Sequence, residues 1–222
     1  NADFDPARLE RYLALARRAR VPPVVALTRA GACADPDVYV DAAREVSGTA
    51  EVLALNACDP AAVARLDTWC GTGETAALVG MSGGGKSTLT NALTGGSEAT
   101  GPIREADARG RHTTTARAMR RARAGGWLID TPGMRALRLA DAAEGIAAVF
   151  EDIASLAGDC RFRDCGHEGE PGCAVEAAIG AGTLDPARLA RWRKLAREEA
   201  HNSATLVESR RAGRAVGRIS RQ

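Results

Sequence analysis

The sequence predicts an α/β protein with a parallel sheet, followed by a small helical domain that binds a metal. Two observations lead to this fold class. Short apolar runs alternate with amphipathic segments over the first 150 residues, and three cysteines and a histidine gather within fourteen residues nearer the C-terminal end. We therefore expect an α/β domain over residues 1–150 and a zinc-binding, basic helical domain over 151–222.

Helix and strand signals alternate from the first residues onward. Residues 5–20 repeat apolar positions at helical spacing, with Asp5 as N-cap and Pro6 in the first turn. The runs 24–28 and 52–57 have strand length, and the segment between them opens with an Asp-Pro cap signal. This is a β-α-β unit, which predicts parallel strands.

The second half of the α/β region has the same alternation. Residues 75–81 predict a strand and 87–93 a helix, while 115–133 holds two strands joined at Gly125-Gly126, which is a hairpin signal. Farther on, 185–200 predicts a basic helix, and we expect the tail from 209 to be mobile.

The bulk composition is that of a globular protein, with 45% hydrophobic and 26% charged residues in a chain of 222. No apolar run reaches the length of a membrane span and no secretory signal is visible, so we expect a cytoplasmic protein with no membrane partner. Because the first residue is Asn1 rather than Met, we expect a fragment or a trimmed chain.

Charge is placed unevenly along the chain. From residue 188 to the end there are ten basic and three acidic residues, a net +7, so residues 1–187 carry −5. A basic C-terminal segment on a near-neutral body indicates an anionic partner, with nucleic acid the first candidate. The alternative is a solvated helix face followed by a disordered tail.

A phosphate-binding loop lies between the strand at 75–81 and the next helix. Gly80, Gly85, Lys86 and Ser87 fit the pattern G-x-x-x-x-G-K-[ST]. Lys86 is one of two lysines beside 28 arginines, and its compact ammonium suits the outer phosphates better than a planar guanidinium does. The pattern predicts a P-loop NTPase three-layer sandwich whose nucleotide contacts include Gly80, Met81, Ser82, Gly83, Gly84, Gly85, Lys86, Ser87 and Thr88.

The stretch WLIDTPG at 127–133 predicts the second half of the phosphate site. Asp130 ends a strand, where ligands bind in open α/β sheets, and we expect it to hold Mg²⁺ through water together with the Ser87 hydroxyl. Gly133 is expected to donate its N–H to the γ-phosphate. In the preceding loop, Thr113 and Thr114 are both candidates for binding Mg²⁺ when a γ-phosphate is present, and the sequence does not separate them.

The base-reading segments precede the phosphate loop in the chain. Thr28, Arg29 and Gly31 follow one apolar strand, and Asn56-Ala57 follows the next. In common GTPases such segments come after the phosphate motifs, so the order here predicts a circularly permuted chain.

The segments LERYLALA, VVALTRAG, GMSGGGKSTLTNAL, GRHTTTA and LIDTPGMRAL, with the cysteine cluster, occur in this order over almost the whole chain. On these residues the chain resembles the circularly permuted small ribosomal subunit biogenesis GTPases (small-subunit-dependent GTPase A). The resemblance implies a monomeric GTP hydrolase with GTP or GDP, Mg²⁺ and one zinc ion. It also implies the small ribosomal subunit and its rRNA as partners, and an oligonucleotide-binding barrel preceding Asn1.

Two positions differ from the usual GTPase patterns. Arg29 and Gly31 stand where the family resembles Asn/Thr-Lys-x-Asp, and the missing carboxylate predicts weakened selectivity for guanine. Met134 stands where common GTPases place a water-orienting Gln, so we expect slow intrinsic hydrolysis that a partner raises. His112 is a candidate to help position water, or else a loop histidine in contact with the partner or solvent. The expected catalytic set is Lys86, Asp130, His112 and Thr114.

The cluster Cys160-x4-Cys165-x-His167-x5-Cys173 has four ligands for a closed tetrahedral zinc site. A closed site is structural, and the alternative is a chance cluster or a disulfide. Cys33, Cys58 and Cys70 are scattered, and we expect them to be small core residues.

The leading hypothesis is a GTP hydrolase that binds the small ribosomal subunit and assists its late maturation, with its nucleotide state coupled to the zinc domain. The alternative is a nucleotide-binding regulatory module with weak turnover and relaxed base specificity. A phosphotransferase with a zinc-bearing lid is a third hypothesis, against which the threonine-rich loop and DTPG argue. The expected contacts to rRNA phosphates are Arg188, Arg191, Arg193, Lys194 and Arg197.

Overall fold

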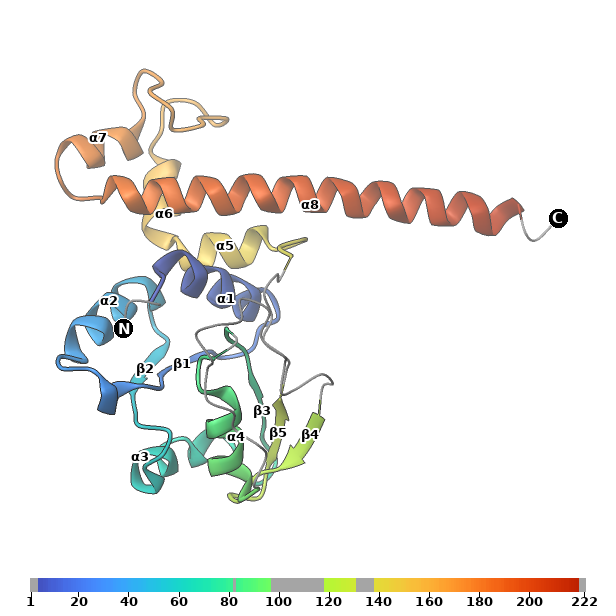
Figure 1. Cartoon of the computed structure of the whole chain (residues 1–222). Coiled ribbons are helices and arrows are strands. Elements are labelled where there is room, and N and C mark those ends of the chain that lie inside the picture. The colour runs from blue at the N-terminus through green and yellow to red at the C-terminus, as the bar shows by residue number, and fades with distance from the viewer. Residues whose placement is uncertain (1–3, 82, 97–117, 131–137, 220–222) are drawn as a thin grey trace, which may run out of the picture. The chain divides into compact units, whose positions relative to one another are not determined.

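The computed structural model describes residues 4–81, 83–96, 118–130 and 138–219 (Figure 1). The chain forms two compact units. The first holds residues 24–45 and 51–137 together with the first four residues, and the second holds 5–23, 46–50 and 138–222. The expected division at residue 150 stays a prediction. Of the helices that the structure describes, none combines the length and the apolar character needed to cross a bilayer.

The first unit contains the predicted β-α-β element. Strands β1 (Val24–Leu27) and β2 (Glu51–Ala54) pair in parallel, with Val24 opposite Glu51. Helix α2 (Asp37–Ser47) connects them, and η1 (Ala30–Ala32) is a single 3-10 turn between β1 and α2. The prediction of a parallel pair from the apolar runs is thus confirmed.

A second sheet of the same unit has the order β3-β5-β4, as Figure 1 shows. Strand β3 (Thr75–Leu78) lies parallel to β5 (Trp127–Asp130), and β4 (Ala118–Arg121) lies antiparallel to β5. The turn from β4 to β5 passes through Gly125, whose φ of +99° favours glycine. A Cβ on Gly126 would lie 2.2 Å from the Gly71 carbonyl oxygen, so the predicted hairpin needs both glycines.

The core of the first unit joins both sheets to two helices. Leu53 and Leu55 from the β2 segment meet Val63 of α3 (Pro60–Ala64) and Leu89 of α4 (Lys86–Thr94), together with Leu128 of β5. The short turn η2 (Asp67–Trp69) leads from α3 toward β3. Of the three scattered cysteines, Cys70 is buried in this core, whereas Cys33 is half-buried and Cys58 is exposed. The expectation of core cysteines is therefore wrong for Cys58, which follows a turn.

The second unit consists of helices. They are α1 (Pro6–Arg18), α5 (Ala143–Val149), α6 (Glu151–Gly158), α7 (Ala174–Gly180) and α8 (Pro186–Ile219). Helices α1 and α5 pack so closely that a Cβ on Gly145 would lie 2.1 Å from the Ala14 carbonyl oxygen. Phe150, Ile153 and Leu189 lie in the core of this unit.

The same dipeptide begins four helices. An aspartate followed by proline precedes α1, α2, α3 and α8, and in each case the carboxylate accepts a backbone N–H two residues on, at 2.9 to 3.2 Å. The aspartate satisfies an N–H that has no partner inside the helix, and proline suits the first helical position. The N-cap expected at Asp5 is confirmed.

Helix α8 is longer than the sequence predicts. It runs for 34 residues to Ile219, so the expectation of a mobile tail from 209 is wrong up to that residue (Figure 1). Among the side chains that the structure describes on α8, Leu195 is the last that is buried. Helix-forming residues such as Arg and Ala continue the helix beyond the part that packs, although two glycines disfavour it.

Candidate nucleotide and metal sites

The phosphate loop connects the end of β3 to the start of α4, as the sequence predicts. Gly83 and Gly85 have φ of +76° and +79°, a region that glycine enters without strain. Gly85 is the N-cap of α4 and has no side chain, so no side-chain cap covers the first N–H groups of that helix. Such N–H groups and the positive end of the helix dipole can bind an anion.

Lys86 folds back over this loop. Its Nζ donates a hydrogen bond to the Gly80 carbonyl oxygen at 2.9 Å and another to that of Met81. Burial lowers the pKa of Lys86, and the charge of Asp130 opposes that shift. The ammonium is thus held at the loop, beside a carboxylate, rather than extended into solvent.

Asp130 lies at the same edge of the sheet as the phosphate loop. It is the last residue of β5 and is in register with Leu78, the last residue of β3. Its side chain is only 2% exposed. A carboxylate at this edge, with the Ser87 hydroxyl in the first turn of α4, is the oxygen donor set that Mg²⁺ prefers.

The two base-reading segments contact the phosphate loop and each other. The Thr28 hydroxyl donates to the Gly84 carbonyl oxygen at 2.8 Å, and the Arg29 guanidinium donates to that of Gly83 at 2.5 Å. Arg29 and Asn56 form an isolated bridge between the segments. The structure thus brings together residues that are more than fifty positions apart in the chain.

Two further predicted residues of this site are placed by the same segments. A Cβ built on Gly31 would lie 3.3 Å from Asn56 Nδ2, so Gly31 faces the second segment. Ala57 is 5% exposed and its side chain packs in the core, which leaves only its backbone for a ligand. Thr88 lies in the first turn of α4. The remaining predicted residues, Ser82, His112, Thr113, Thr114, Gly133 and Met134, lie outside the described residues.

The cysteine and histidine ligands of the second unit converge as the spacing predicts. The candidate ligand atoms of Cys160, Cys165, His167 and Cys173 all lie within 4.8 Å of one another. His167 Nδ1 is 3.6 Å from Cys160 Sγ and 3.5 Å from Cys173 Sγ, and those two sulfurs are 4.0 Å apart. A tetrahedral zinc with ordinary bond lengths requires about 3.6 Å between nitrogen and sulfur and about 3.8 Å between sulfurs. The donor set and its spacing therefore fit zinc.

Backbone geometry holds these ligands in place. His167 is 3% exposed and has a φ of +58°, and Gly172 has a φ of +79°. The Glu170 carboxylate accepts the backbone N–H groups of Gly166 and Glu168 at 2.8 and 2.6 Å. These bonds lower the pKa of Glu170 and keep it charged, which closes the loop around the cluster.

Trp192 supports the cluster from α8. Its ring lies 5.5 Å from the ring of His167, centroid to centroid. The sequence analysis assigned no role to this tryptophan or to Glu170, although a glutamate within a glycine-rich ligand loop is a signal for such a brace. Both act by positioning ligands and neither is itself a ligand.

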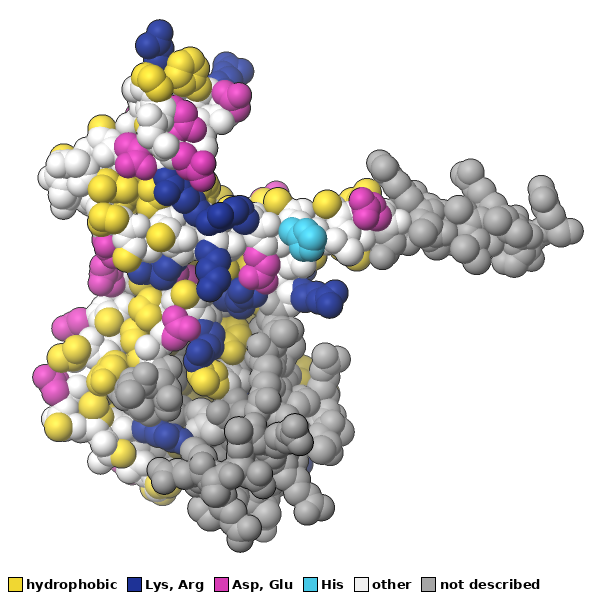
Figure 2. Space-filling model, turned by 45° about the horizontal axis from the view of Figure 1, so that its top comes forward, with side chains coloured by type: hydrophobic (Ala, Val, Ile, Leu, Met, Phe, Trp, Pro, Cys, Tyr) yellow, Lys and Arg dark blue, Asp and Glu magenta, His cyan; other side chains and the backbone are white. Residues whose placement is uncertain are grey.

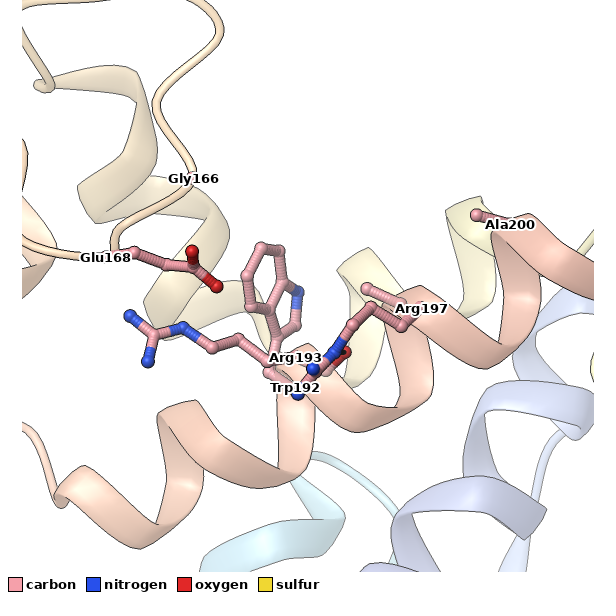
Figure 3. Close-up of a pocket in the computed structure, with 7 residues that line it drawn as sticks. Gly166, Glu168, Trp192, Arg193, Arg197 and Ala200 are labelled. Carbon is pink, nitrogen blue, oxygen red and sulfur yellow. Dashed lines mark hydrogen bonds between the residues drawn. The ribbon is translucent and has the colours of Figure 1, made fainter.

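A groove of about 280 Å³ lies beside the cluster, between the ligand loop and α8 (Figure 3). Its lining includes Glu168 from the loop, and Trp192, Arg193 and Arg197 from the helix. Arg193 pairs with Glu176 at 3.1 Å, and Arg197 is exposed. The groove therefore presents an aromatic face and a basic group to solvent.

The arginines expected to contact RNA have different environments. Arg188 is 9% exposed, and its guanidinium binds Asp152 at 2.5 Å and Glu10 at 3.2 Å. The prediction that Arg188 contacts RNA phosphate is wrong, because its charge is buried and already paired. Arg191 also pairs with Glu10, at 3.0 Å. In Figure 2 basic and acidic side chains alternate over this face, as such pairing requires.

Comparisons with known proteins agree with this geometry. The sequence model of the family described as RsgA GTPase matches residues 1–140. The small ribosomal subunit biogenesis GTPase RsgA of Mesorhizobium japonicum is 51% identical over 226 residues, covering 100% of this chain and 65% of that protein. The RsgA 2 protein of Vibrio vulnificus is 48% identical over 222 residues, covering 100% of this chain and 64% of that protein. The chain therefore spans somewhat less than two thirds of these relatives.

Two solved structures share the fold. YjeQ from Thermotoga maritima matches with a TM-score of 0.62 and 23% identity, over 88% of this chain and 66% of that one. YloQ, described as a circularly permuted GTPase, matches with a TM-score of 0.61 and 25% identity, over 90% of this chain and 64% of that one. The predicted α/β fold with permuted order is confirmed by these similarities.

Proposed function

The chain belongs to the RsgA GTPase family, and from this membership we propose that it hydrolyses GTP while bound to the small ribosomal subunit during late maturation. The observation that supports this most is the position of Lys86. Its ammonium lies on a glycine-rich loop at the end of β3, beside Asp130 at the end of β5. We further propose a cytoplasmic monomer.

Each residue of the nucleotide site has a physical role in this proposal. Lys86 and the first N–H groups of α4 would bind the outer phosphates and stabilise the charge that develops during transfer. Ser87 and Asp130 would hold Mg²⁺, which neutralises phosphate charge. Thr28, Arg29, Gly31, Asn56 and the Ala57 backbone would surround the base. The proposal keeps Thr114 or Thr113, Gly133 and His112 as the residues that complete the γ-phosphate side.

The zinc cluster would serve as a structural site. Cys160, Cys165, His167 and Cys173 complete a four-ligand shell, which leaves no position for a substrate. The chain leads from Asp130 through residues 131–137 directly into the second unit, so a change at the γ-phosphate has a short covalent route to that unit. We propose that this connection couples the nucleotide state to the grip on rRNA.

Lys194 and Arg197 remain as candidate contacts to RNA phosphates. Both are exposed on α8, unlike the buried Arg188, and Arg197 lines the groove beside the cluster. Replacing both with Gln should lower the slope of log affinity against log salt by about two contacts' worth for binding to the small subunit, with nucleotide binding unchanged. An unchanged slope would remove these residues from the interface.

The test of the proposed function is phosphate release from GTP, measured with and without purified small ribosomal subunits. A rate that the subunits raise many-fold supports the proposal. Nucleotide binding with no stimulation would instead support the regulatory module with weak turnover, which the absence of a carboxylate at Gly31 favours. No binding of any nucleotide would refute both.

A further inference from the structure

The base-reading segments present hydrogen-bond donors toward the phosphate loop. The Thr28 hydroxyl and the Arg29 guanidinium already donate to carbonyl oxygens of Gly84 and Gly83. These contacts fix both segments against the loop that would hold the phosphates. A nucleotide bound at that loop would therefore bring its base to the Arg29, Gly31 and Asn56 side of the site.

Guanine and adenine differ in what their edges offer. Guanine presents N1–H and a 2-amino group, both donors, whereas adenine has an unprotonated N1 and no 2-amino group. A carboxylate is the side chain best suited to accept two donors side by side, because it carries only acceptors when ionised. Strong discrimination against adenine therefore needs an acceptor at this edge.

The two carboxylates of these segments are used elsewhere. Asp35 Oδ1 accepts the N–H of Asp37 at 3.2 Å at the start of α2, and Asp59 Oδ1 accepts the N–H of Ala61 at 3.0 Å at the start of α3. Moving either toward a base would uncap its helix, at a cost of about 1 kcal/mol. Neither carboxylate is placed to read guanine.

Asn56 does not supply the missing acceptor. Its Oδ1 accepts the backbone N–H of Cys58 at 3.1 Å, which turns its Nδ2 toward Gly31. An amide N–H can donate to N7 of either purine, so it binds a purine without distinguishing the two. Gly31 itself has no side chain.

We propose that the base site of this protein accepts purine nucleotides with little preference for guanine over adenine, because Gly31 leaves it without an acceptor for guanine's N1–H and 2-amino groups. The proposal rests on the nucleotide site proposed above and defines its substrate class. GTP remains a substrate in this view, and ATP becomes a competing one.

The structure allows the missing carboxylate to be restored. The backbone of Gly31 is outside the left-handed region that disfavours side chains. A Cβ there would lie 3.3 Å from Asn56 Nδ2 and 3.5 Å from Asn56 Cγ, atoms of a side chain that can shift by a few tenths of an ångström. Gly31→Asp should therefore be tolerated, and the Asn56 amide can donate to the new carboxylate. Gly31→Asn is the matched control, with the same size but no charge.

The experiment is a titration of the full chain with fluorescent GDP and ADP in the presence of Mg²⁺, with circular dichroism confirming that each variant folds. The wild-type protein should bind GDP and ADP with dissociation constants within about tenfold of each other, since no charged acceptor favours guanine. Gly31→Asp should raise the preference for GDP by about 100-fold, from two hydrogen bonds to a charged group, and Gly31→Asn should not.

The wild-type comparison decides the proposal even where a variant fails to fold. GDP binding more than about 100-fold tighter than ADP binding would overturn it and leave the proposed GTPase function standing. A folded Gly31→Asp variant with an unchanged ratio would remove Gly31 as the determinant. If neither nucleotide binds, the proposed function itself fails.

Discussion

The buried carboxylate of Glu10 joins α1 to α8 within the second unit, and its replacement by Gln is a direct test of how that unit is held together. Glu10 is fully buried. It accepts from Arg191 Nε with both oxygens at 3.0 Å and from an Arg188 terminal nitrogen at 3.2 Å. Gln would keep one acceptor and turn an amide N–H toward guanidinium groups that can only donate.

The expected loss follows from the partners that remain. Breaking a buried ion pair by removing one member costs about 3–5 kcal/mol, because a charge is left buried without compensation. Arg188 keeps Asp152 and the Val149 carbonyl oxygen, whereas Arg191 keeps only Asp185 at 4.0 Å. We therefore expect about 3 kcal/mol, at the lower end of that range.

Glu198→Gln is the matched control, because it makes the same change between the same two helices. Glu198 pairs with Arg11 at 2.5 Å, but the two side chains are 31% and 22% exposed, so about 1 kcal/mol is expected. The assay is equilibrium urea unfolding followed by the fluorescence of Trp192, in a chain whose Trp69 and Trp127 are replaced by Phe. Equal losses for Glu10→Gln and Glu198→Gln would refute the reasoning, since burial would then make no difference.

Three further predictions concern the second unit. Cys173→Ser should lower bound zinc from one equivalent to a substoichiometric amount, measured by metal analysis of the purified chain, while nucleotide binding persists; full zinc retention would exclude Cys173 as a ligand. Gly145→Ala should destabilise the unit by about 3 kcal/mol in the urea assay because its Cβ meets the Ala14 carbonyl oxygen, whereas Gly158→Ala, with nothing within 4 Å, should be neutral or stabilising. Although burial opposes the shift, hydrogen bonds from an arginine lower the pKa of Asp152, so this group contributes stability that is present above its ordinary pKa and lost as pH falls through the lowered value. Asp152→Asn should therefore flatten the fall in stability below pH ~4, and an acid limb identical to that of the wild type would exclude this contribution.

Local patterns predicted much of the first unit and both candidate sites. The Gly125-Gly126 pair predicted the hairpin because the turn requires a positive φ, and an Asp-Pro pair predicted the start of α1 because capping is a local interaction. The lysine after a glycine run, and the spacing of the zinc ligands, indicated sites because the chemistry needs those residues close together along the chain.

Contacts between distant segments were not predictable in the same way. Nothing in residues 5–20 indicates that α1 packs on α5, since that depends on Gly145 more than a hundred residues away. Arg188 reads as a surface cation within a basic helix, and only the fold brings Glu10 and Asp152 to it. The length of α8 was also missed, because the glycines near its end disfavour a helix that the structure nevertheless continues.

The most direct test of the account is the affinity of Mg²⁺–GDP for Lys86→Met, measured by calorimetry against Arg44→Met. Arg44 lies on α2 in the same unit, and its side chain is 64% exposed, so its replacement removes the same charge from a solvated surface. The account predicts that Lys86→Met weakens binding by about 100-fold or more, from the loss of charge-assisted hydrogen bonds to phosphate, while Arg44→Met binds as the wild type does. Wild-type affinity in Lys86→Met would contradict the assignment of this loop as the phosphate site.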